Sequence, residues 1–519
     1  MLKLHIRAKD VPGRWTWTGR QWQSGASWIE PYDHPALEVL DQTPDSPAMV
    51  VRERIPGRDA QPHHPQWAGD FVVVQFAGDS MWLEAGTHGI APIYLIEHGN
   101  VLHGSWDVAD LADQVREAPL QERELVRQLT GRFRYTHETL WEGLNWLTER
   151  SRAVYSRHGL RLCYPLAAAH GRPRQLHPDA DPVAAYQRLL DEVLDRHAYD
   201  PATTAVELSG GLDSANVAAT LGARHPGQIT AAAMLIVGDA GEQQQDRRRR
   251  MINLFGLGEN VTTRMIDNLP LRPGGRRASR ALITPYDELY DEGKSSLVAL
   301  LGERGIRTVV TGIGGDEMVA LTLDELSRPA LGMDTPAATW FGPRTLHLLD
   351  DTDTAIASAS VVNEMTLMAM ACVAPPLLRA GMWPIHPLAD PTLIRFGDWL
   401  PYQWRHRKQL HRARLASLGC DPYLTDPPLR ENFEQVMGLG LRRYGVAYLR
   451  EILDEGSPLI ADGYLDPDGL ATTMAGIDAG TAVPDDHEIC RVSSLEATLR
   501  SYGHARSPAT VAASTAAPV

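Results

Sequence analysis

Two glycine-rich, acidic segments carry the residue types best suited to chemistry in this chain. The first reads SGGLDS and spans residues 209–214, between an apolar run and a helical pattern. Adjacent glycines let a backbone approach an anion closely, and the amide groups at the start of a helix attract phosphate. Asp213 is unexpected there, because a carboxylate repels phosphate unless a cation such as Mg²⁺ bridges the two. This loop is therefore predicted to hold phosphate groups together with a metal ion.

The second segment, TGIGGDEM at residues 311–318, ends another strand of the same predicted unit. Strands alternate with helices here, and the strands are expected over residues 204–209, 229–237, 261–267 and 307–313. This alternation is typical of a doubly wound α/β fold, a parallel sheet with helices on both faces, which binds ligands at the carboxyl ends of its strands. Carboxylates at adjacent strand ends, such as those of Asp213 and Asp316, can hold one metal ion on a phosphate-bearing ligand.

Lysine is scarce, because the 50 basic residues include four lysines, Lys3, Lys9, Lys294 and Lys408. Where arginine is the usual cation, a lysine in the second half suggests a need for a compact point charge. Lys294 lies in EGKSS, which resembles part of a Walker phosphate loop. However, Glu288 stands where that loop needs its first glycine, and no strand precedes it, so Lys294 is not expected to bind phosphate.

The hexapeptide SGGLDS resembles the pyrophosphate loop of the ATP-pyrophosphatase family that includes the synthetase domain of asparagine synthetases. The resemblance implies an ATP-dependent, AMP-forming ligase: ATP adenylates a carboxylate, pyrophosphate leaves, and an amine displaces AMP. It assigns Mg²⁺ to Asp213 and Asp316. It assigns ATP or pyrophosphate to Ser209, Gly210, Gly211, Leu212, Asp213, Ser214, Met234, Gly312 and Gly315. The segment RKQLHR (407–412) is similar to the family's K-x-x-L-R element, which gives Lys408 a catalytic role on the phosphate and the developing transition state.

Residues 1–170 resemble the glutamine-hydrolysing half of asparagine synthetases, a class II amidotransferase-like α+β domain. That enzyme uses an N-terminal cysteine after removal of the methionine, but position 2 is Leu2, and Gly86, Thr87 and His88 replace the family's arginine-rich stretch. We therefore expect a degenerate domain that releases no ammonia and packs on the synthetase domain. A Pro-rich linker (170–182) precedes that domain, which is expected over residues 183–502 with a mostly helical C-terminal part, and residues 503–519 are expected to be a disordered tail.

Two relatives of this architecture lack the cysteine and close rings: β-lactam synthetase and the lasso peptide macrocyclase. The segment VNEMT (362–366) resembles the β-lactam enzyme's Asn-Glu-Met stretch and makes Glu364 a candidate base. Its partner tyrosine is replaced by Ile313, and the GGDE form of the second motif looks most like the lasso cyclases. The resemblance thus implies a precursor peptide substrate, with a leader-binding protein and a leader peptidase as partners. Ring closure of a small β-amino acid, an ammonia-using asparagine synthase and a non-enzymatic scaffold remain as alternatives.

Composition and charge argue against several other classes of function. The net charge of −15 offers no basic field for nucleic acid, and the basic run DRRRRM (246–251) is expected to be a solvated helix face. No apolar run is long enough for a membrane-spanning helix, and the first residues lack the apolar stretch of a secretion signal. The four cysteines are scattered, which suits a reducing cytoplasm.

Overall fold

The computed structural model describes residues 1–519 apart from 42–47, 58–67, 327–336, 481–485 and 504–519. The tail predicted over residues 503–519 therefore lies outside the described residues, except for Gly503.

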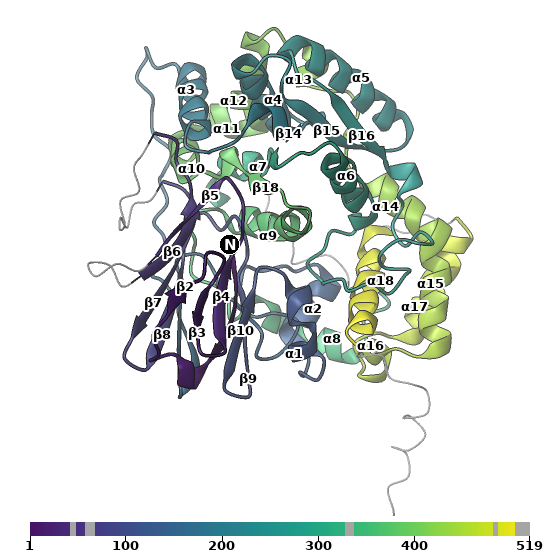
Figure 1. The fold of residues 1–519 in the computed structure, drawn as a ribbon. Coiled ribbons are helices and arrows are strands. Elements are labelled where there is room, and N and C mark those ends of the chain that lie inside the picture. The colour runs from purple at the N-terminus through teal and green to yellow at the C-terminus, as the bar shows by residue number, and fades with distance from the viewer. Residues whose placement is uncertain (42–47, 58–67, 327–336, 481–485, 504–519) are drawn as a thin grey trace, which may run out of the picture.

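Two antiparallel sheets form the N-terminal part (Figure 1). The first, in spatial order, contains β11 (Asn145–Trp146), β9 (Tyr94–His98), β10 (Val101–Ser105), β1 (Leu2–Arg7), β4 (Ser27–Pro31), β3 (Trp22–Ser24) and β2 (Thr16–Trp17). The second contains β13 (Gly159–Cys163), β12 (Arg152–Ser156), β8 (Ser80–Ala85), β7 (Phe71–Ala77), β6 (Ala48–Glu53) and β5 (Leu37–Leu40). Alternate residues of β7, such as Val72 and Val74, are buried, as expected for a strand with one face on a core. Two short helices, α1 (Ala112–Val115) and α2 (Glu122–Thr130), complete this part, and its origin as a glutaminase-like domain stays a prediction.

A five-stranded parallel sheet follows, which confirms the α/β pattern predicted for this region. Its spatial order is β16 (Asn260–Arg264), β15 (Thr230–Leu235), β14 (Thr204–Glu207), β17 (Thr308–Val310) and β18 (Trp383–Ile385). The sequence did not predict β18, because its three apolar residues lie in a region that is otherwise helical.

Helices cover both faces of this sheet. One face packs on α4 (Leu212–Arg224) and α5 (Gly238–Phe255), behind which lie α3 (Pro182–Leu194) and α12 (Gln409–Ser417). The other face packs on α6 (Asp291–Glu303) and α9 (Glu364–Arg379). Neighbouring residues of β14 enter these two apolar cores separately, since Val206 packs with α4 and Ala205 packs with α6.

The remaining helices confirm that residues 330–500 are mostly helical among those described. They are α8 (Pro343–Leu348), α10 (Pro391–Trp399), α11 (Tyr402–Arg405), α13 (Pro422–Thr425), α14 (Glu434–Gly440), α15 (Val446–Glu455), α16 (Pro458–Ala461), α17 (Pro467–Asp478) and α18 (Asp486–Ser501). A further short helix, α7 (Gly315–Met318), precedes this region. A second apolar core joins α2 to α14, α15, α17 and α18, so the C-terminal helices pack against the N-terminal part as well (Figure 1).

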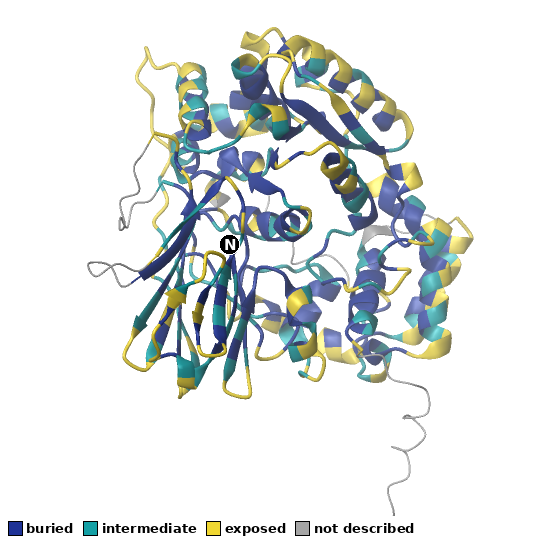
Figure 2. Ribbon diagram, viewed as in Figure 1, coloured by how far each residue is buried: buried dark blue, intermediate teal, exposed yellow. Residues whose placement is uncertain are grey.

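The N-terminal sheets also contact the segment around β18 directly. The Trp383 indole nitrogen donates to Glu53 at 3.0 Å, and the Tyr32 hydroxyl donates to the Leu378 carbonyl at 2.9 Å. Arg379 donates to Asp107 at 2.7 Å. Figure 2 shows this junction as largely buried, in contrast to the exposed outer side of α5. These contacts fix one edge of the parallel sheet, at β18, against the N-terminal part.

Candidate functional site

The loop at residues 209–214 joins β14 to α4, where the sequence placed it. Gly210 has φ +99°, a conformation that other residues rarely adopt, and Gly211 precedes the first turn of α4. The Ser214 hydroxyl accepts from the Ser209 amide at 3.2 Å, and the Ser209 hydroxyl accepts from the Gly211 amide at 3.2 Å. The two serines therefore hold the turn in shape before any ligand binds.

Side chains from α5 hold the strand that leads into this loop. The Gln244 amide donates to the Ser209 carbonyl at 2.8 Å and to the Met234 carbonyl at 3.2 Å, which links the ends of β14 and β15. Arg248 donates to the Leu208 carbonyl, and Arg247 pairs with Glu431 at 2.7 Å. The prediction that the run 246–251 is a solvated face is therefore wrong for Arg247 and Arg248, which are buried, because their guanidinium groups satisfy carbonyl and carboxylate oxygens inside the fold.

The second acidic segment lies directly against the first loop. A Cβ added to Gly312 would lie 2.6 Å from the Ser214 amide nitrogen, and one added to Gly315 would lie 2.5 Å from the Asp213 carboxyl carbon. Real Cβ atoms do not approach other heavy atoms this closely, so both positions require glycine. The parallel pairing of β14 with β17 brings the two motifs together, as the sequence predicts.

Lys408 joins the two predicted metal ligands. Its ammonium nitrogen lies 2.6 Å from a carboxylate oxygen of Asp213 and 2.6 Å from one of Asp316. The backbone at Arg407 and Lys408 is left-handed, with φ values of +51° and +55°, in a turn between α11 and α12. Such conformations cost about 1–3 kcal/mol each in non-glycine residues and occur often at functional sites. The chain thus adopts a strained turn at the residue that brings a cation to both carboxylates.

Burial controls the charges of this cluster. It raises the pKa of Asp213 to about 6, although the Lys408 ammonium acts in the opposite direction. At Lys408 burial lowers the pKa, but the two carboxylates outweigh it and the net pKa is raised. His411 lies 3.9 Å from Asp213, and burial lowers its pKa to about 3, so the imidazole is neutral at physiological pH. Lys408 is therefore the cation that neutralises Asp213 in this structure.

The carboxylate pair has the chemistry that Mg²⁺ requires. One oxygen of Asp213 is buried without a hydrogen-bond partner, and the Asp213 and Asp316 carboxylates converge on a single positive charge. The described residues include no group of three or more His, Cys, Asp or Glu side chains able to hold a metal. Two carboxylates suffice for Mg²⁺ where phosphate oxygens and water complete its shell, which is its usual coordination in nucleotide sites.

Glu364 stands apart from this cluster. It is the first residue of α9, whose start Asn363 caps by accepting from the Met365 amide. Burial raises the pKa of Glu364, while the charge of Arg134 lowers it. Within the part of the chain that the structure describes, neither a hydrogen bond nor an ion pair links Glu364 to Lys408, Asp213 or Asp316. Its role as a base stays a prediction.

Ile313, which stands at the expected tyrosine position, packs against a buried apolar cluster. The cluster contains Tyr135, Val362, Leu367, Met370, Ala389 and Ile394. An aliphatic side chain in such surroundings cannot relay a proton, in agreement with the missing Tyr–Glu pair.

The sequence did not predict the role of Lys294, a buried lysine near the loop. The side chain of Lys294 is 5% exposed, and its ammonium pairs with Glu207, the last residue of β14. The signal was available, because this is one of four lysines in the chain, but its partner lies 87 positions away and no local pattern indicates it. Lys294 lies in the first turn of α6 and points at the strand, so it stabilises the strand end next to Ser209 rather than a phosphate loop of its own.

Comparison with known proteins identifies the region that contains the two loops. The family model described as asparagine synthase matches residues 185–372, a span that includes the 209–214 loop, Asp316 and Glu364 but not Lys408. No curated protein matches the chain. The match supports an asparagine synthetase-like domain that forms amides at the expense of ATP. None of the described helices has the length and apolar character needed to cross a lipid bilayer.

Proposed function

We propose that the protein closes an amide bond within one substrate, with a carboxylate activated as its adenylate and an amine of the same molecule as the nucleophile. One observation carries the proposal: a single ammonium group, that of Lys408, contacts both carboxylates at the ends of β14 and β17. Carboxylates that share a cation in this way are suited to hold metal-bound triphosphate at the edge where a parallel sheet binds its ligands.

The chain's own residues supply most of the chemistry of this proposal. The turn at Gly210 and Gly211 would bind the β- and γ-phosphates. Mg²⁺ held by Asp213 and Asp316 would neutralise part of the triphosphate charge. Lys408 would move from the carboxylates to the α-phosphate and offset the charge that develops as the substrate carboxylate attacks and pyrophosphate leaves. In the second step the amine gives a proton to a base, for which Glu364 is the candidate, its nitrogen bonds to the acyl carbon, the bond from that carbon to the phosphate oxygen breaks, and AMP departs.

Two departures from a glutaminase support an amine from within the substrate. Leu2 stands where a glutaminase needs its cysteine, and its side chain is fully buried in β1. His88, in the segment that replaces the arginine-rich stretch, lies 3.8 Å from Asp390 at the start of α10. A side chain engaged in this contact between parts of the chain is not free to hold glutamine. We therefore favour a lasso peptide cyclase, in which the N-terminal amine of a precursor peptide attacks an activated Asp or Glu side chain.

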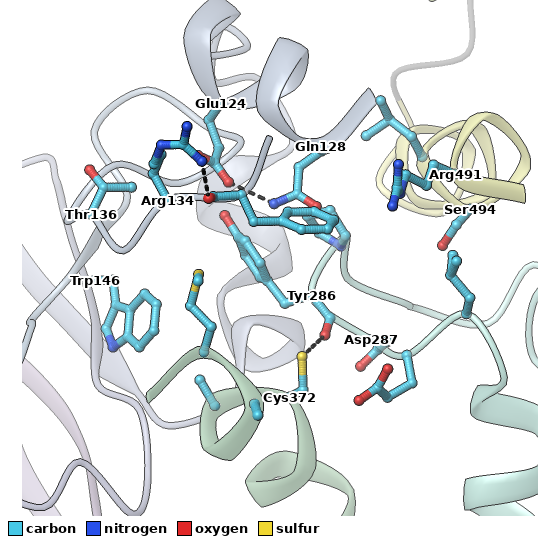
Figure 3. A pocket seen from close by; sticks show the side chains of 18 of the residues that line it. Glu124, Gln128, Arg134, Thr136, Trp146, Tyr286, Asp287, Cys372, Arg491 and Ser494 are labelled. Carbon is cyan, nitrogen blue, oxygen red and sulfur yellow. Dashed lines mark hydrogen bonds between the residues drawn. The ribbon is translucent and has the colours of Figure 1, made fainter. Parts of the chain in front are cut away.

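Ring closure of a small β-amino acid is the second candidate, and the size of a cavity favours it. The largely apolar cavity beside α9 measures about 310 Å³ (Figure 3), near the lower limit for sites that hold small ligands. A small substrate would fit it whole, whereas a precursor peptide would place one part in it.

Exchange of radioactive pyrophosphate into ATP distinguishes the two candidates. The proposal predicts exchange stimulated by a peptide that has a free N-terminus and an Asp or Glu seven to nine residues along. Stimulation by a small β-amino acid and not by such peptides would favour the second candidate. Exchange with aspartate and amide formation from added ammonia would contradict the intramolecular reaction. No exchange with any carboxylate substrate would leave a scaffold role.

A further inference from the structure

The cavity beside α9 is formed by segments from three parts of the chain. Its walls come from α2 and residues 133–138 of the N-terminal part, from the loop at residues 285–289 and α9, and from α18 (Figure 3). A site formed by three such parts exists only in the complete fold. None of the predicted site residues lines it, but Met365, the next residue after Glu364, does.

Four aromatic rings and four carboxylates are among the residues that line the cavity. Tyr94, Phe133, Trp146 and Tyr286 are among its walls, and Figure 3 shows Trp146 and Tyr286 facing the space. Four carboxylates line it, Glu124, Glu138, Asp287 and Glu288, against two guanidinium groups, those of Arg134 and Arg491. Arg134 is held in an ion pair with Asp353, and Arg491 lies over the Phe133 ring at 5.5 Å. Carboxyl groups therefore outnumber guanidinium groups among the lining residues.

The four carboxylates differ in the ion pairs and hydrogen bonds that they form within the protein. Glu138 pairs with Arg123 at 2.5 Å and with Arg127 at 3.1 Å, and Glu124 pairs with Arg127 at 3.3 Å. Asp287 accepts from the Thr284 amide at 2.9 Å and lies 3.8 Å from Arg276.

Glu288 is the exception among these four. It forms no ion pair with a lysine or arginine anywhere in the described part of the chain, and its protein partner is the Tyr290 hydroxyl. Burial raises its pKa, although the charge of Lys294 acts in the opposite direction. A cationic ligand in the cavity would supply the counter-charge that Glu288 lacks.

Two sets of contacts connect this cavity to the nucleotide loops. Lys294, whose charge reaches Glu288, pairs with Glu207 at the end of β14, two residues before Ser209. On the other side, Trp146 and Met368 of the lining pack in the same apolar cluster as Ile313, the neighbour of Gly312. The cavity lining is therefore linked to one loop through Lys294 and to the other through the apolar cluster that contains Ile313.

We propose that this cavity binds the amine-bearing part of the substrate, an apolar or aromatic group with a primary ammonium that pairs with Glu288. The inference rests on the proposed function, because it gives that reaction the site of its nucleophile. Aromatic faces attract organic cations, and a charge-assisted hydrogen bond to Glu288 fixes the direction of the amine. The arrangement selects against anionic groups, since the Glu288 carboxylate, which forms no ion pair among the described residues, would repel them.

Phenethylamine, 2-phenylethanol and phenylacetate test the inference on the full-length protein by titration calorimetry. They share a ring of one size and differ in charge. The wild type is expected to bind phenethylamine at least about 10-fold more tightly than the alcohol, and phenylacetate most weakly. Glu288→Gln, which removes the charge and keeps the shape, should weaken phenethylamine binding about 10-fold or more. Ala369→Leu, which fills the cavity from α9, should weaken all three, while Glu142→Gln at an exposed site should change none.

Equal phenethylamine affinity for wild type and Glu288→Gln, or tighter binding of phenylacetate than of phenethylamine, would overturn the inference. A thermal melt of each variant identifies any loss of fold, and Ala369→Leu tests the cavity independently of Glu288. Pyrophosphate exchange distinguishes a failure of the amine site from a failure of the proposed adenylating function. Exchange without phenethylamine binding would refute the amine site alone, whereas binding without exchange would refute the adenylating function and leave the cavity's preference for amines intact.

Discussion

Replacement of Lys408 by methionine tests the catalytic role of the cation that joins the two motifs. The substitution keeps an unbranched apolar stem of similar length and removes the ammonium group and its charge. A unit charge about 4 Å from another interacts with roughly 4 kcal/mol near a protein surface. The Lys408 side chain is 23% exposed, so solvent screens part of this energy. We expect a loss of about 3 kcal/mol of transition-state stabilisation, or about 10²–10³-fold in kcat, similar to the removal of one oxyanion donor.

Two properties of the Lys408→Met variant should change in opposite directions: its rate of pyrophosphate exchange should fall and its affinity for Mn²⁺ should rise. In pyrophosphate exchange with a substrate that the wild type accepts, Lys408→Met should lose about 10²–10³-fold in rate. In the absence of nucleotide, the variant should bind Mn²⁺ more tightly than the wild type, because the ammonium no longer competes for Asp213 and Asp316. Lys9→Met, at an exposed lysine, is the matched control and should change neither quantity. An unchanged kcat in Lys408→Met would show that the lysine serves only to neutralise carboxylates.

Three further predictions concern the loops, the C-terminal helices and the N-terminal part. Gly312→Ala should reduce pyrophosphate exchange at least about 10-fold, because its Cβ would push the second motif off the Ser214 amide. Glu496→Gln should be more favourable, relative to the wild type, at pH 8 than at pH 5, by up to about 3 kcal/mol in the free energy of urea unfolding. The reason is that burial raises the pKa of Glu496 to about 7. Leu2→Cys should show no glutaminase activity when glutamate release is measured, because residue 2 is buried in β1.

The sign of the Glu496 prediction follows from proton binding. Its ordinary pKa is 4.5, so between about 4.5 and 7 the folded protein holds this proton more strongly than the unfolded chain. Stability of the wild type therefore falls as the pH rises through that window, and glutamine removes this fall. Parallel stability profiles of the wild type and the variant would contradict this prediction.

For Gly312→Ala the control is Gly476→Ala in α17, where the new Cβ meets nothing within 4 Å and no exchange activity should be lost.

Local sequence patterns predict much of the site and of the parallel sheet that holds it. The hexapeptide at 209–214 and the alternation of strands and helices required no knowledge of distant contacts, because a turn between a strand and a helix is encoded by neighbouring residues. The same holds for the second motif, whose glycines are needed where it crosses the first loop. The position of Lys408 came from its resemblance to a family element and not from any physical property of the turn that holds it.

Contacts between segments far apart in the sequence could not be predicted from it. The buried pair of Lys294 and Glu207 joins residues 87 positions apart, and Arg248 reaches a carbonyl 40 positions away, so each appears in the sequence as an ordinary charge on a helix. The three-residue strand β18 was missed because it is too short to show a period. The cavity beside α9 was missed for the same reason as the ion pairs, since α2, α9 and α18 meet only through tertiary packing.

A crystal structure with Mg²⁺ and a non-hydrolysable ATP analogue tests the central claim most directly. The account predicts the triphosphate on residues 209–214, the metal between the carboxylates of Asp213 and Asp316, and the Lys408 ammonium moved from those carboxylates to phosphate. The Asp213→Ala variant, soaked in the same way, should lack the metal. A triphosphate bound elsewhere, or a metal that contacts neither aspartate while Lys408 still pairs with both, would contradict the account.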